Sequence, residues 1–349
     1  MKFFRLPFLI AILTFTGARY ILAQETNRDC IIRNEFIFDS APFAECHAST
    51  IAETADGLAV AYFGGTAEKN PDVAIWISLY RNGKWDVPVE IANGISPDGK
   101  RYPCWNPVLY RDGSGVLLLF YKVGPDPVNW WGMIMKSADG GRTWSVPARL
   151  PDGILGPVKN KPVRLQNGEL LCPTSTEAGE WQVYFERTAD LGLTWSKSGF
   201  VDDPRHMQAI QPAILFHGRK RLQALCRSRG NVIAESWSKD NGKTWTPLAP
   251  TSLPNPNSGI DAVTLTDGRQ LLVYNPSNVP EGKWTGPRSP ICIAISKNGK
   301  VWHKVLTLDS EPGELSYPAV IQTSDGMVHI TYTWKRTTIR HITVDPDNI

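Results

Sequence analysis

Four side chains of this sequence suit chemistry on a sugar acid. Arg227 in ALCRSR and Arg288 in GPRSPIC carry planar guanidinium forks that bind a carboxylate through two parallel hydrogen bonds. His47 titrates near neutral pH and Tyr317 in GELSYPAV carries a phenol, so the two form a candidate base and acid pair. Neutralising a uronate carboxylate stabilises the charge that develops when the C5 proton leaves. These residue types therefore predict β-elimination at a uronate end, by a lyase or a dehydratase.

A repeated polar turn suggests how these residues are brought together. The turns SADGGRTW, TADLGLTW and SKDNGKTW end at Trp144, Trp195 and Trp245, and weaker copies end at Trp85 and Trp302. The gaps between them are 59, 51, 50 and 57 residues, which is the length of one propeller blade. Each copy is a Gly-containing turn between short β-rich runs, as a hairpin requires.

A second signal runs out of phase with the first. Six short turns each precede an apolar run, and their glycines are Gly57, Gly113, Gly168, Gly218, Gly268 and Gly326. The sixth unit lacks the Trp turn, so Glu35 to Phe38 is expected to supply its outer strand and close a ring. The two signals predict an all-β chain folded as a six-bladed β-propeller.

The S-x-D-x-G-x-T-W turns resemble the Asp-box (BNR) repeats of the sialidase superfamily over essentially all of residues 24–349. The resemblance implies a six-bladed catalytic propeller. In that family three Arg hold the substrate carboxylate, a Tyr activated by a Glu attacks, and an Asp protonates the leaving group. Arg227 and Arg288 match the second and third Arg, Tyr317 matches the nucleophile, and Asp72 in NPDVAIW lies in the region of the acid.

The sequence departs from the family pattern at two positions. His47 stands where the first Arg would be, and Gln211 stands where the Glu would be. A neutral amide cannot take the proton of Tyr317 as a carboxylate can. We therefore expect elimination, with His47 and Tyr317 as base and acid and Asp72 as a further catalytic candidate. The set also resembles, in fold and chemistry, the His/Tyr/Arg apparatus of propeller-shaped lyases that act on rhamnose-uronate polymers.

Other residues are expected to contact the sugar. Lys122 in LLLFYKVG and Lys161 in GPVKNKPV occupy corresponding places in the second and third units, where they would add to a positive field around the axis. Trp130 and Trp131 offer flat apolar surfaces on which a sugar ring can stack. The complete set expected to bind substrate is Arg227, Arg288, Lys122, Lys161, Gln211, Trp105 and Asn106.

Two alternatives remain open from the sequence. The first is an exo-glycosidase of sialidase type, with Tyr317 as nucleophile and Asp72 as acid. It would release a free acid sugar without a new double bond. The second is a non-catalytic carbohydrate-binding propeller, in which the changes at His47 and Gln211 mark the loss of an ancestral activity. Such a protein would bind a sugar and leave it unaltered.

Composition and charge set limits on the partners. Residues 1–23 have the positive start and short apolar run of a secretory signal, so we expect a secreted or periplasmic protein with no membrane span. Removing that segment leaves 34 Lys and Arg against 34 Asp and Glu. A neutral chain is a poor candidate for binding nucleic acid or an anionic membrane. The expected partner is an acidic oligosaccharide or polysaccharide.

The cysteines suggest no metal site. The six cysteines include no CxxC pair and no paired His spacing, so neither a zinc site nor another metal or cofactor is expected. Cys172 and Cys226 sit near the ends of apolar runs and are expected to be buried thiols. A disulfide between Cys46 and Cys104 remains an open alternative.

Overall fold

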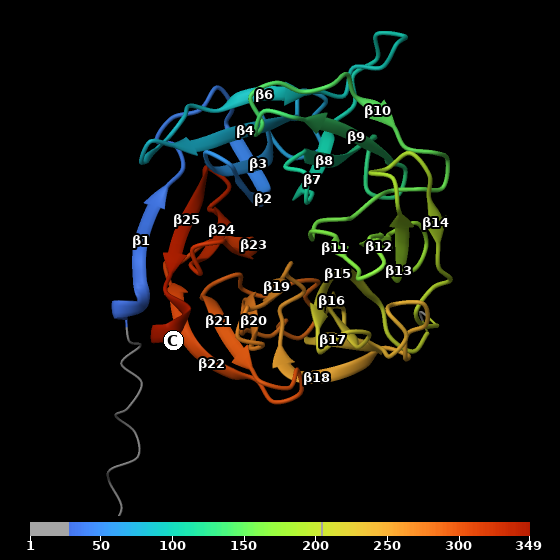
Figure 1. Ribbon diagram of the computed structural model, residues 1–349, viewed down its shortest axis with the longest axis vertical. Coiled ribbons are helices and arrows are strands. Elements are labelled where there is room, and N and C mark those ends of the chain that lie inside the picture. The colour runs from blue at the N-terminus through green and yellow to red at the C-terminus, as the bar shows by residue number, and fades with distance from the viewer. Residues whose placement is uncertain (1–27, 204) are drawn as a thin grey trace, which may run out of the picture.

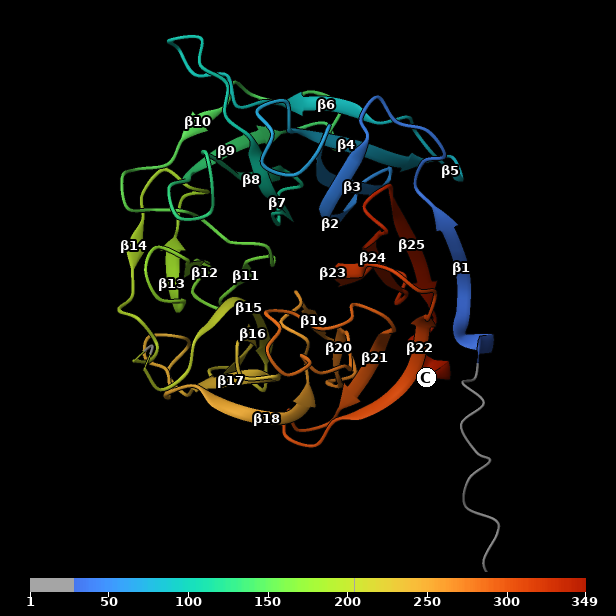
Figure 2. The same cartoon turned by 180° about the vertical axis from the view of Figure 1, so that it is seen from behind.

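Six antiparallel sheets surround a central axis (Figures 1 and 2). The computed structural model describes residues 28–203 and 205–349, so the expected signal segment lies outside the described residues. The prediction of an all-β six-bladed propeller is confirmed. The first strand of each blade lies nearest the axis (Figure 1).

Blades 1 to 3 occupy the first half of the ring. Blade 1 contains β2 (Glu45–Thr54), β3 (Gly57–Gly65), β4 (Ala74–Arg81), β5 (Lys84–Trp85) and β6 (Val89–Ala92). Blade 2 contains β7 (Cys104–Arg111), β8 (Leu117–Val123), β9 (Trp131–Ser137) and β10 (Ala148–Arg149). Blade 3 contains β11 (Val163–Arg164), β12 (Leu170–Thr176), β13 (Gln182–Thr188) and β14 (Ser196–Lys197).

Blades 4 to 6 complete the ring. Blade 4 contains β15 (Ala209–Phe216), β16 (Leu222–Ser228), β17 (Val232–Ser238) and β18 (Ala249–Pro254). Blade 5 contains β19 (Asp261–Thr264), β20 (Gln270–Tyr274), β21 (Ile291–Ser296) and β22 (His303–Asp309). Blade 6 contains β23 (Leu315–Gln322), β24 (Val328–Trp334), β25 (Thr338–Val344) and the N-terminal β1 (Ile31–Phe36). Short 3₁₀ turns flank it at Arg28–Cys30 and Pro346–Asn348.

The middle strands of the blades form the core. Every residue of β8, β16 and β21 is buried. A strand that is buried on both faces has a continuously apolar sequence, whereas a strand with one exposed face alternates between apolar and polar residues. Neighbouring blades supply those two covers, which explains why the sequence LLLFY is uninterrupted in β8.

The Asp-box turns are self-contained and lie outside the site. In the first of them, Asp139 Oδ1 accepts hydrogen bonds from the backbone N–H groups of Arg142 and Thr143. The hydroxyl of Thr143 donates to Asp139 Oδ2 at 2.6 Å, and Trp144 Nε1 donates to the Gly141 carbonyl at 3.1 Å. The repeated residues therefore stabilise hairpin turns.

The ring is closed by its N-terminal strand. β1 pairs antiparallel with β25 in blade 6, as expected for the segment around Glu35, although the strand begins earlier, at Ile31. Glu35 lies opposite His341 and accepts a hydrogen bond from it at 3.1 Å. His341 Nε2 in turn lies 3.0 Å from His329 Nδ1. This chain of polar contacts joins the two ends of the propeller.

Acid is expected to weaken that closure. Burial lowers the pKa of His329 to about 4 and lowers the pKa of His341. The unfolded chain therefore binds more protons than the folded chain between about pH 6.5 and pH 4, so stability falls as the pH falls through this window. Urea unfolding at pH 7 and pH 4.5 should show a loss that His329→Gln reduces by about 1–3 kcal/mol.

The exposed His303 provides the matched control. His303→Gln should retain the full acid-induced loss of the wild type. Equal losses in the wild type and His329→Gln would show that the His329 and His341 pair does not control the closure.

Candidate active site

A left-handed residue marks the axial end of every blade. The positive φ angles at these residues are 56° at Ala48, 38° at Asn106, 75° at Lys159, 57° at Gln211, 58° at Asn257 and 53° at Tyr317. In β2, β7, β15 and β23 the residue lies within a break in the strand register. Such bulges turn side chains away from the ladder. Each non-glycine residue costs about 1–3 kcal/mol in this conformation, so the surrounding blades must hold it there.

Tyr317 lies at the centre of the predicted site. Its hydroxyl oxygen accepts a hydrogen bond from Arg227 Nη1 at 2.7 Å, and the Gln211 amide donates to the same oxygen at 3.4 Å. The His47 ring centroid is 4.2 Å from the Tyr317 ring centroid, and Arg288 Cζ is 5.8 Å from it. The fold thus brings together five of the residues singled out in the sequence, from blades 1, 4, 5 and 6.

His47 is a buried imidazole with an unpaired nitrogen. Its exposed fraction is 3%, and Nδ1 has no hydrogen-bond partner within the described part of the chain. Burial lowers the pKa of His47 well below its ordinary value, and the positive charge of Arg336 lowers it further. The ring is therefore neutral at neutral pH and can accept a proton.

A carboxylate missed by the sequence analysis organises the cations. Glu314 accepts hydrogen bonds from Arg288 at 2.7 Å and from Arg336 at 2.9 Å, and its Oε1 lies 3.9 Å from His47 Nδ1. Burial alone would raise the pKa of Glu314, but the positive charges of Arg288 and Arg336 lower it below its ordinary value. Arg336 also pairs with Glu68 at 2.6 Å. The Glu three residues before Tyr317 was the available signal, whereas no pattern marked Arg336.

Lys159 is a buried lysine that lies beside Tyr317 and joins three blades. It is 4% exposed, and its ammonium donates to the carbonyls of Ile260 and Pro318 and, at 2.9 Å, to the Asn160 side chain. Burial lowers the pKa of Lys159 to about 7. One side chain therefore connects blades 3, 5 and 6 beneath Tyr317.

The other two predicted lysines have structural partners. Lys161 Nζ forms an ion pair with the buried Asp261 at 2.8 Å and donates to the Ala262 carbonyl. Lys122 is completely buried and donates to the Pro157 carbonyl at 2.8 Å. The structure does not bring either lysine to Tyr317, because each is held by acceptors of the protein itself.

Asp72, Trp105 and Asn106 have contacts elsewhere in the fold. The Asp72 carboxylate accepts hydrogen bonds from the Thr66 backbone and hydroxyl at 2.8 and 2.9 Å, so it holds its own loop. Trp105 is 2% exposed and is covered by Phe63, which separates it from His47. Asn106 is buried at the left-handed position of blade 2. None of the three is shown in contact with Tyr317.

The sequence analysis also missed a carboxyl and two tryptophans beside Arg227. Burial raises the pKa of Glu177, against the lowering effect of Arg227 and Arg229. The guanidinium of Arg229 lies 4.6 Å from the Trp181 ring and 4.5 Å from the Trp284 ring. Trp284 is 58% exposed. These residues form a cationic and aromatic rim on one side of the site.

Metal, membrane and cysteine features were also located. Residues 28–203 and 205–349 contain no cluster of three or more His, Cys, Asp or Glu suited to a metal ion. No helix within those ranges has the length and hydropathy to cross a membrane. Cys172 and Cys226 are buried thiols, as expected. Cys46 and Cys104 are buried and are not joined by a disulfide.

Comparison with known proteins places this geometry in a family. A family described as a BNR repeat-like domain matches residues 56–330. The chain belongs to this family. As a BNR propeller it is similar to a sialidase of Bacteroides fragilis, with 24% identity over 194 residues, 48% of this chain and 32% of the relative. The matched part is therefore about a third of that relative's length.

Solved structures show the same fold at low sequence identity. A Dyadobacter fermentans protein of unknown function has a TM-score of 0.73 and 18% identity, covering 90% of this chain and 98% of its own. The Hadza microbial sialidase Hz136 has a TM-score of 0.73 and 18% identity over 87% and 66% of the two chains. The NanB sialidase of Streptococcus pneumoniae has a TM-score of 0.72 and 11% identity over 90% and 71%. The BNR propeller is thus of sialidase type in fold.

Replacing Lys159 is expected to loosen the propeller. Lys159→Met leaves the buried carbonyls of Ile260 and Pro318 without their donor, and unsatisfied buried acceptors are costly. Urea unfolding should show a loss of about 2–4 kcal/mol. The matched control is Lys243→Met at an exposed position, which should stay within about 0.5 kcal/mol of the wild type. Equal stabilities of the two variants would contradict the role of Lys159 in joining the three blades.

Proposed function

We propose that this BNR propeller is a carbohydrate-active enzyme that acts on uronate ends by β-elimination at the central site around Tyr317. The observation that carries the proposal is the pairing of His47 with Tyr317. A neutral, buried imidazole with a free nitrogen lies against a phenol whose oxygen is held by a guanidinium. A candidate base, His47, and a candidate acid, Tyr317, are thus adjacent.

The two aromatic side chains have environments that fit different roles. His47 is kept neutral by burial, which suits a general base. Arg227 donates to the Tyr317 oxygen at 2.7 Å, so the phenolate left after proton donation would be stabilised by an adjacent positive charge. These environments favour His47 as the base and Tyr317 as the acid.

The surrounding guanidinium groups fit a substrate carboxylate. Arg288 is 18% exposed at its side chain. Within residues 28–203 and 205–349 its side chain donates only from Nη1, to Glu314, whereas a guanidinium carries five N–H donors. Arg227 commits Nε to Asn257 and Nη1 to Tyr317, which leaves Nη2. The free edges of the two groups would bind the uronate carboxylate and stabilise the charge that develops at C5.

The proposed step conserves atoms and electrons. His47 takes the C5 proton, and the electron pair of that C–H bond forms the C4=C5 double bond. The bond from C4 to its oxygen breaks, and Tyr317 gives its proton to that oxygen. The products are an unsaturated uronate and either an alcohol or water, and proton exchange with solvent returns both side chains to their starting forms.

Hydrolysis of sialidase type is the second candidate. Arg227 beside Tyr317 would also stabilise a phenolate nucleophile, and relatives of similar fold carry the name sialidase. Gln211 occupies the position from which a carboxylate would take the Tyr317 proton, and Asp72 is hydrogen-bonded to Thr66. These two features place hydrolysis second.

Product analysis on uronate-capped oligosaccharides tests the proposal. The wild type should raise ultraviolet absorbance through a new C4=C5 double bond conjugated to the carboxylate. Tyr317→Phe and His47→Ala should each lower the rate by about a hundredfold to ten-thousandfold, the range of general acid and base catalysis. Mass spectrometry of the products should show the unsaturated sugar.

Asp72→Asn separates the two candidates. Elimination should proceed at close to the wild-type rate in this variant, since Asp72 has no part in the proposed step. Release of a free acid sugar without new absorbance, abolished by Asp72→Asn, would overturn elimination in favour of hydrolysis. Tight binding of every sugar without turnover would overturn both.

The pH profile should report the depressed pKa of His47. Because burial and Arg336 lower it, the acid limb of kcat/KM should lie below the ordinary histidine pKa of about 6.5. Arg336→Gln removes a positive charge that opposes protonation of His47, so the limb should move to higher pH. An unchanged or lower limb in Arg336→Gln would contradict His47 as the titrating base.

A further inference from the structure

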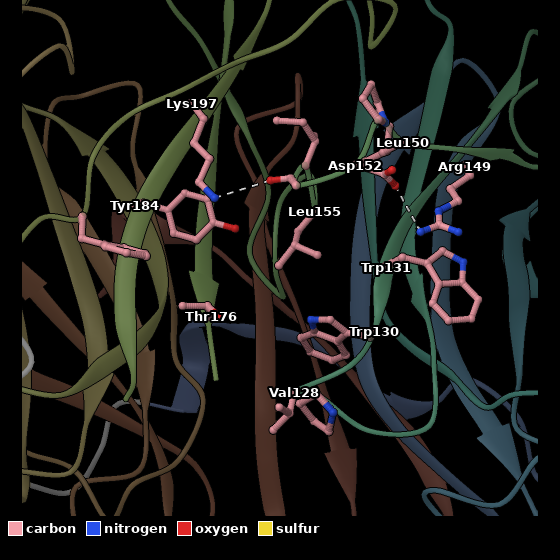
Figure 3. A pocket seen from close by; sticks show the side chains of 15 residues that line it. Val128, Trp130, Trp131, Arg149, Leu150, Asp152, Leu155, Thr176, Tyr184 and Lys197 are labelled. Atoms are coloured by element: carbon pink, nitrogen blue, oxygen red, sulfur yellow. Dashed lines mark hydrogen bonds and ion pairs between the residues drawn. The ribbon is translucent and has the colours of Figure 1, made fainter. Parts of the chain in front are cut away.

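A pocket lies between blades 2 and 3 (Figure 3). Its volume is about 270 Å³, near the lower end of the range of about 300–1,000 Å³ for small-molecule sites. It is therefore large enough for about one sugar ring. Its lining includes four aromatic residues and two cations, namely Trp130, Trp131, Tyr184, Phe200, Arg149 and Lys197.

The wall of this pocket is held from beneath by a buried carboxyl. Glu186 of β13 is completely buried and accepts hydrogen bonds from the backbone N–H groups of Leu155 and Gly156 at 3.0 and 2.6 Å. Leu155 lines the pocket. The loop that forms one side is thus fixed before any ligand arrives, which lowers the entropic cost of binding.

The cations lie over aromatic rings at opposite sides of the pocket (Figure 3). Arg149 Cζ is 5.2 Å from the Trp131 ring centroid, and Lys197 Nζ is 4.3 Å from the Tyr184 ring centroid. Asp152 is the one carboxylate in the lining, is 95% exposed and lies 3.3 Å from Arg149. Such an exposed ion pair is weak, so a ligand carboxylate can replace Asp152 beside Arg149.

The ring surfaces explain why a sugar fits better than a small anion. Phe200 is 50% exposed, and the Trp131 ring is half-buried, so both present apolar area to the pocket. An inorganic anion would use the cations and leave this area in water. A pyranose ring with a carboxylate uses both kinds of surface.

Aromatic contacts connect this pocket to the central site around Tyr317. Trp130 contacts Trp105, Trp105 contacts Phe63, and Phe63 contacts His47, with ring centroids 6.1, 6.2 and 5.6 Å apart. On the blade 3 side, Thr176 lines the pocket. Burial raises the pKa of the neighbouring Glu177, and the charge of Arg227 opposes that rise. Three aromatic side chains in series, Trp130, Trp105 and Phe63, thus connect this pocket to His47.

From these contacts we infer that the pocket between blades 2 and 3 is a second carbohydrate-binding site, which takes a uronate residue of an acidic polysaccharide chain. The aromatic faces supply stacking area, and Arg149 and Lys197 supply the charge for the carboxylate. The preference for uronate over other acid sugars rests on the function proposed for the central site. The binding itself requires no chemistry.

Direct binding measurements test this site separately from catalysis. Polygalacturonate is the long probe, a uronate disaccharide the short one, and a neutral glucan the uncharged one. The protein carries Tyr317→Phe to suppress turnover. Lys197→Glu and Phe200→Ala, both at exposed positions, should each weaken affinity for polygalacturonate about tenfold or more. The disaccharide should keep its affinity for the central site, which contains neither Lys197 nor Phe200.

Matched controls on the same fold exclude general effects of charge and apolar area. Lys243→Glu and Leu193→Ala lie at exposed positions in Asp-box turns outside the pocket lining and should leave polygalacturonate binding unchanged. Loss of binding in Lys243→Glu equal to that in Lys197→Glu would overturn the site, as would unchanged binding in Lys197→Glu and Phe200→Ala. Binding of the neutral glucan as tight as that of polygalacturonate would overturn the acidic ligand. Polymer binding that depends on Lys197, without turnover of any uronate by the wild type, would support this site and refute the proposed elimination.

Discussion

The convergence of six strands on one axis is the constraint on which the rest of the structure depends. Strands that continued straight would collide at the centre, and the chain instead turns through one left-handed residue at the axial end of every blade. Each such residue is costly by itself. The cost is offset because the turn places polar side chains against one another, as with Gln211 and Tyr317, and because Lys159 joins blades 3, 5 and 6 below them.

Charge balance is the second consequence of this convergence. Arg227, Arg288 and Arg336 meet in a small volume, and Glu314 neutralises part of their charge. Burial, helped by the surplus positive field, keeps His47 neutral, and the same arrangement leaves guanidinium donors available for an anion. The site is therefore prepared for a negatively charged ligand although the mature chain is expected to have no net charge.

The fold could be predicted from local sequence patterns, whereas the candidate site could be predicted only in part. Turn chemistry and apolar runs predicted the six blades, and they placed the closing strand near Glu35, because each blade is built from contacts that are near in sequence. The candidates His47, Gln211, Arg227, Arg288 and Tyr317 came from the resemblance of the sequence to the sialidase superfamily. Lys122 and Lys161 were misplaced because a positive charge in a sequence does not reveal its acceptor. The carbonyl and carboxylate that hold them come from other segments and other blades.

The amino-acid order by itself determined how many blades form, since hairpin turns and strand periodicity are local properties, and its resemblance to the sialidase superfamily indicated which five residues could meet at the axis. Only the tertiary structure decided what surrounds them. The neutral state of His47, the coupling of Arg288 and Arg336 through Glu314, and the separate pocket around Trp130 and Trp131 each depend on distances between blades. Burial and Coulomb interactions act across those distances, and they produce no periodic pattern in the amino-acid sequence.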